Sequence, residues 1–141
     1  MKELIEVLHT GNYSCVIRSS NETHTFSQRG VADLYDIVKN RPGFLEGSLV
    51  ADKVVGKAAA ALMILGGIAE LYAEVISSSA LALLRDADIA VGFGREVPFI
   101  ENRDKSNWCP LEKMCYNETS AKTILPLVEE FIGSLQERQK G

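Results

Sequence analysis

Two of the chain's three cysteines fall in one eight-residue stretch, WCPLEKMC at residues 108–115. Cysteine, proline and glutamate together are compatible with a metal site, a reactive thiol or the start of a helix. Cys109 and Cys115 are six residues apart, which on a helix separates them by about 120° around the axis and roughly 9 Å along it. Because a disulfide needs Cα atoms within about 7 Å, the spacing predicts neither a disulfide nor a shared metal ion.

A helix start accounts for most of this stretch. Pro110 is favoured as the first helical residue, which makes Cys109 the N-cap and lets Glu112 reach back to the Cys109 N–H, as in a capping box. Serine or aspartate would cap better than cysteine, and a thiol at a helix N-terminus has a lowered pKa. A reactive or ligand-contacting Cys109 therefore stays open as the alternative, whereas Cys15 and Cys115 are expected in the core.

A second group of polar residues precedes two apolar segments. Ser77, Ser78 and Ser79 lead into the helical pattern SSSALALLRDA, and Lys57 opens the alanine-rich segment GKAAAALMILGG. The hydroxyls and first N–H groups of a helix can bind an anion, and a nearby lysine would add positive charge. The alternative is that the serines only cap the helix while the lysine side chain extends to solvent or pairs with an acid.

Glu74 is the polar residue that the strand pattern places most unusually. In ELYAEVIS, residues 70–77, it alternates with Tyr72 and Ile76, so strict alternation puts its carboxylate on an apolar face. A buried charge needs a partner. Lys57 is the candidate, because the helix that it opens is expected to pack on this strand.

The periodicity along the chain predicts helices and strands in an alternating order. The predicted elements are a helix at 2–9, a hairpin over 13–20 and 23–28, a helix at 31–40, a short strand or loop within 48–55, a helix at 56–67, a strand at 70–77, a helix at 77–87, a short buried strand at 89–93, a further strand at 95–101, and helices at 109–116 and 120–139. Within this order, we expect GFGRE, residues 92–96, to form a tight turn where a strand ends. The pattern is that of an α/β fold, three layers with a mixed sheet, in a single domain over residues 1–141.

The composition of the chain argues against nucleic acids and membranes as binding partners. The net charge of −4 argues against binding to a phosphate backbone. The longest apolar run, 58–69, contains two glycines and is shorter than the ~20 residues that span a bilayer. The charged N-terminus does not resemble a signal peptide. We expect a cytoplasmic protein with reduced cysteines, no nucleic-acid partner, no membrane partner, no cofactor and no metal, since His9 and His24 lack a second ligand at metal spacing.

The central portion, residues 52–94, resembles the cytidine deaminase-like superfamily in its order of elements and its apolar pattern. More closely, the chain resembles an uncharacterised bacterial family that is grouped with that fold. In zinc deaminases a helix opens with His-x-Glu and a second helix opens with Pro-Cys-x-x-Cys, which together hold the catalytic zinc. The resemblance therefore implies a deaminase-like fold and two helix starts that meet at one site.

The metal-binding residues of that family have no counterparts in this sequence. Lys57 stands about where the histidine would be and Ala59 about where the glutamate would be. Ser77, Ser78 and Leu81 stand near the proline and the two cysteines. A site without these ligands cannot activate a zinc-bound water, so the resemblance carries the fold and argues against zinc-dependent deamination.

The function expected from these observations is binding of a small ligand, anionic or nucleotide-like, in the pocket that the zinc site has vacated. The residues expected to contact it are Lys57, Glu74, Ser77, Ser78, Ser79, Cys109 and Glu112. One alternative is an enzyme of different chemistry that uses Cys109 with Glu112 and Lys57. Another is an interaction module that acts as a homo-oligomer.

Overall fold

The computed structural model describes residues 1–28, 30–101 and 107–140. Its elements are α1 (Lys2–Thr10), β1 (Cys15–Ser19), β2 (Glu22–Phe26), α2 (Ala32–Asn40), β3 (Leu49–Val55), α3 (Lys57–Gly66), β4 (Glu70–Ser77), α4 (Ser78–Asp86), β5 (Ala90–Val97), α5 (Pro110–Cys115) and α6 (Ala121–Lys140). The segment within 48–55 is thus a full strand.

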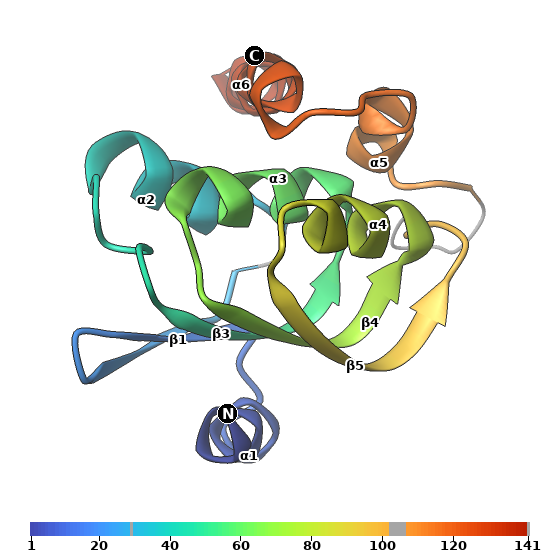
Figure 1. Ribbon diagram of the computed structural model, residues 1–141. Coiled ribbons are helices and arrows are strands. Elements are labelled where there is room, and N and C mark those ends of the chain that lie inside the picture. The colour runs from blue at the N-terminus through green and yellow to red at the C-terminus, as the bar shows by residue number, and fades with distance from the viewer. Residues whose placement is uncertain (29, 102–106, 141) are drawn as a thin grey trace.

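The strands form one mixed sheet in the order β2-β1-β3-β4-β5. β1 is antiparallel to both β2 and β3, whereas β3, β4 and β5 are parallel to one another. The parallel strands are joined through α3 and α4, which lie with α2 on one face of the sheet, while α1 lies on the other (Figure 1). The predicted α/β class, with a mixed sheet between helical layers, is confirmed.

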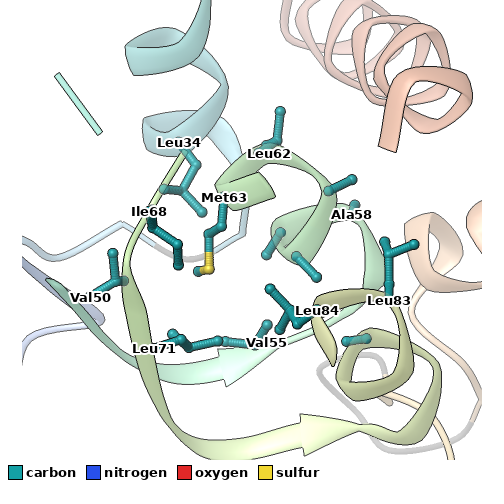
Figure 2. Packing of buried hydrophobic residues seen from close by; sticks show 14 of the residues in the cluster. Leu34, Val50, Val55, Ala58, Leu62, Met63, Ile68, Leu71, Leu83 and Leu84 are labelled. Carbon is teal, nitrogen blue, oxygen red and sulfur yellow. The ribbon is translucent and has the colours of Figure 1, made fainter. Parts of the chain in front are cut away.

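Helix α3 lies at the centre of the molecule. Every residue from Lys57 to Met63 is buried, because the helix contacts the sheet on one side and α6 on the other, where α5 and α6 form an outer layer (Figure 1). Figure 2 shows Leu62 and Met63 of this helix among the apolar residues of the core. A helix that is apolar on all sides needs such complete burial.

Helix α1 covers the opposite face of the sheet over a smaller apolar cluster. The buried members of this cluster are Leu4, Leu8, Val16 and Ala51. The sheet therefore has a large core beneath α2, α3 and α4 and a small one beneath α1. No helix in the described ranges is both long and apolar enough to cross a membrane.

The prediction for the end of the sheet is wrong in two respects. β5 is a single eight-residue edge strand and is mostly exposed, where a short buried strand and a separate second strand were expected. GFGRE lies inside it, so it is not an exit from a strand. Gly94 is needed there because an added Cβ would lie 2.9 Å from the backbone oxygen of Glu74. The polar stretch NRDKSN, residues 102–107, is typical of a loop, and residues 102–106 of it lie outside the described residues.

Candidate functional site

A buried carboxylate lies where α3 and α4 begin. Glu112, on α5, is 3% exposed. Its Oε1 accepts hydrogen bonds from the N–H of Lys57 at 3.2 Å and from the hydroxyls of Ser77 at 3.1 Å and Ser79 at 3.3 Å. Its Oε2 accepts from the N–H of Ile100 at 3.3 Å. We call these five residues the carboxylate site.

The fold and one glycine make room for this carboxylate. β3 and β4 are parallel, so the helices that follow them begin at the same edge of the sheet, where their N-termini favour an anion. Gly56 precedes α3, and a Cβ added there would lie 2.7 Å from Oε2 of Glu112. Ser77 has two roles, because its hydroxyl also caps α4 by accepting from the N–H of Ala80 at 3.3 Å.

The Lys57 ammonium is buried beside this site with few partners. The residue is 6% exposed, and its Nζ donates to the carbonyl oxygen of Tyr116 at 2.8 Å. Within the described ranges no carboxylate forms an ion pair with it. An ammonium has three donors, so two of them have no protein acceptor in the described part of the chain. Lys57 thus does not extend to solvent, and among the described residues it pairs with no acid.

Ser78 stands next to the carboxylate site but points away from it. Its residue is exposed, and its hydroxyl donates to Oε2 of Glu96 on β5 at 2.7 Å. The three serines therefore divide into two that contact the Glu112 carboxylate and one that joins α4 to the edge strand.

The predicted pair of Lys57 and Glu74 does not form. Glu74 contacts the His9 imidazole of α1 instead, on the other face of the sheet. The reason is that β4 does not alternate strictly. Ala73 and Ile76, an odd number of residues apart, both belong to the large core, so Glu74 does not share a face with Ile76.

The expectations for the cysteines are only partly confirmed. Cys109 is the N-cap of α5, with Pro110 following at its start. The predicted capping box does not form. The N–H of Cys109 donates to the carbonyl of Ile100 at 2.8 Å, and the Glu112 carboxylate is bound in the carboxylate site. Cys15 and Cys115 are buried as expected. Burial raises the pKa of the Cys115 thiol to about 11, so that thiol is protonated at neutral pH.

Three aromatic rings lie beside the site, at positions that no sequence pattern predicts. Phe99 stacks on Trp108 with ring centroids 4.4 Å apart, and Trp108 meets the edge of Tyr116 at 4.9 Å. Two of the rings adjoin the site through the backbone, since Phe99 precedes Ile100 and the carbonyl of Tyr116 binds Lys57. Residue spacing gives no signal for this cluster, because contacts between these rings form only in the folded chain.

The site has the chemistry of an anion receptor. Its donors are two backbone N–H groups and two hydroxyls, all on one carboxylate, with a buried ammonium nearby. Across the described ranges, no three side chains of histidine, cysteine, aspartate or glutamate converge as metal ligands.

Comparison with known proteins identifies the family. Residues 3–132 match the model described as TM1506, a domain of unknown function (DUF1893). The chain belongs to this family. A solved DUF1893 family protein, TM1506 from Thermotoga maritima, superposes with a TM-score of 0.84 and 27% identity over 92% of this chain and 87% of that one. The fold of this DUF1893 chain is thus also that of a crystallographically known relative.

A second solved structure is more distant. RibD from Acinetobacter baumannii matches with a TM-score of 0.44 and 15% identity, over 66% of this chain and 33% of that one. A comparison with curated protein sequences finds no match.

Proposed function

We propose that this DUF1893 chain binds a small molecule bearing a carboxylate or phosphate, and that this acid group takes the place of the Glu112 carboxylate. The observation that carries the proposal is the convergence of four donors on one carboxylate. These donors come from the start of α3, from Ser77 and Ser79 around the start of α4, and from Ile100. Such preorganised donors suit any acid group of similar size.

The buried Lys57 ammonium supports the same conclusion. A buried charge is costly unless it is paired, and the Lys57 Nζ is bonded to one neutral carbonyl among the described residues. An acid larger than a carboxylate, such as a phosphate, would supply further oxygens to the two remaining donors. The expected pocket is thus filled by the chain itself, and Glu112 is its intramolecular occupant.

Replacement of Glu112 requires movement of α5, a short helix of six residues. An external acid competes with a tethered carboxylate of high effective concentration, so simple acids should bind weakly. The natural ligand must gain additional affinity from contacts beyond its acid group.

The test is an NMR titration of the 15N-labelled protein with acetate and with inorganic phosphate, at constant ionic strength in chloride. We expect the amide signals of Lys57 and Ile100 to shift saturably with either acid. The double variant Ser77→Ala/Ser79→Ala should weaken the response, whereas Ser134→Ala, an exposed serine on α6, should leave it unchanged. If neither acid moves these amides more than chloride does, Glu112 is a permanent structural element and the proposal is wrong.

The alternative chemistry on Cys109 gains no support from the geometry. In the described part of the chain, no hydrogen bond joins its thiol to Glu112, whose carboxylate is held by the donors of the site. The interaction-module alternative stays a prediction.

A further inference from the structure

A hollow of about 340 Å³ lies at the opposite end of α3 from the carboxylate site. It is enclosed by the C-terminal ends of α2 and α3 and by the connection that follows α2. The apolar residues of its wall are Ile37, Val38, Leu45 and Leu65. Two charged residues, Arg41 and Glu46, also line it.

The backbone around this hollow is fixed by glycines. Gly43 and Gly67 line it with φ of +86° and +80°, and Gly47 closes the connection with φ of +70°. This left-handed region is open to glycine at little steric cost. The N–H of Gly47 donates to the carbonyl of Gly67 at 2.8 Å, which joins the connection to the end of α3. The hollow is therefore a formed feature of the fold.

The two charges at the hollow are opposite and available. Arg41 and Glu46 are both exposed, and neither takes part in an ion pair with any described residue. The Arg41 guanidinium lies 4.0 Å from the centroid of the Phe44 ring, which holds it in place. The C-terminal ends of α2 and α3 add partial negative charge near Glu46, which favours a ligand cation there.

We propose that this hollow binds a small zwitterion with an apolar body, the chemical class of an apolar amino acid. Its carboxylate would bind Arg41, and its ammonium would bind Glu46 near the C-terminal ends of α2 and α3. Its side chain would lie on Leu45 and Leu65. The proposal is independent of the carboxylate site, because the two places lie at opposite ends of α3 and share no residue.

The test uses three probes of nearly equal shape. L-leucine carries both charges, 4-methylvalerate carries only the carboxylate and 3-methylbutylamine only the ammonium. We expect L-leucine to bind in calorimetry and to shift the amide signals of Gly43 and Gly67. Each single-charge probe should bind at least about tenfold more weakly, the effect of losing one charge-assisted hydrogen bond.

Charge-neutral variants assign the two contacts. Arg41→Gln should abolish the difference in affinity between L-leucine and 3-methylbutylamine. Glu46→Gln should abolish the difference in affinity between L-leucine and 4-methylvalerate. Arg85→Gln and Glu130→Gln remove exposed charges elsewhere and should change neither ratio. Absence of L-leucine binding, or equal binding of all three probes, overturns the proposal.

Discussion

The carboxylate of Glu112 joins three separate parts of the chain. It connects the start of α3, the start of α4 and Ile100 through hydrogen bonds of 3.1–3.3 Å. The structure brings Lys57, Ser77 and Ser79, which the sequence places near two helix starts, to this one carboxylate. The sequence could not predict that Glu112 fills this site, because α5 is brought there by tertiary packing.

The fold opposes ionisation of the Asp52 carboxyl group. Burial is the largest cause that raises its pKa from 3.8 to about 7. A carboxyl group with a raised folded-state pKa contributes its full stability below pH 3.8, and this contribution is lost as the pH rises from there to about 7. Asp52→Asn should therefore stabilise the protein at pH 8 by about 2–4 kcal/mol relative to wild type.

The measurement is urea unfolding of wild type and Asp52→Asn at several pH values. The difference in free energy of unfolding between them should grow from pH 4 to pH 7 and then level off. The amide can keep the hydrogen bond that Oδ1 accepts from the N–H of Val54 at 3.3 Å. A difference that does not change with pH would contradict the raised pKa.

At the scale of elements, Gly56 controls how closely α5 approaches α3. A methyl group there would lie 2.7 Å from Oε2 of Glu112 and 3.3 Å from Cγ1 of Ile100. Gly56→Ala should therefore destabilise the protein by about 1–3 kcal/mol in denaturant unfolding. In a Glu112→Ala background the same change should cost much less, because the carboxylate that it meets is gone.

Gly133→Ala is the matched control for this change. A Cβ added to Gly133 in α6 meets nothing within 4 Å, so alanine should stabilise that helix by up to about 1 kcal/mol. Equal effects of Gly56→Ala with and without Glu112 would show that the cost arises elsewhere than at the carboxylate.

Most of the order of elements could be predicted because most elements had a clear local signal. The apolar run with Gly66 and Gly67 marked α3, and Ser77 marked the start of α4, which it caps. Two predictions were wrong, namely the face of the sheet on which Glu74 lies and the burial of β5. Both properties depend on which elements pack beside the strand. Glu74 lies on the face of α1 because the alternation of side chains in β4 is broken. β5 is exposed because it is the edge strand of the sheet.

At the scale of the whole molecule, the outer layer formed by α5 and α6 contributes buried side chains to the hydrophobic core. Ile124 and Val128 of α6 are fully buried against the layer that contains α3. Ile124→Ala should lower the free energy of unfolding by about 2–5 kcal/mol. Leu135→Ala, in the same helix but at a residue 41% exposed, should change it by less than about 0.5 kcal/mol. Similar small effects would show that α6 only lies on the surface.

The central claim is that the donors around Glu112 accept an external acid. Glu112→Ala leaves these donors without their acceptor and should cost about 3 kcal/mol or more. The most direct measurement is thermal unfolding of this variant with increasing acetate, matched for ionic strength with chloride. Acetate should raise its Tm more than that of wild type and of Glu129→Ala, which removes a partly exposed carboxylate elsewhere. Equal shifts in all three proteins would contradict the account.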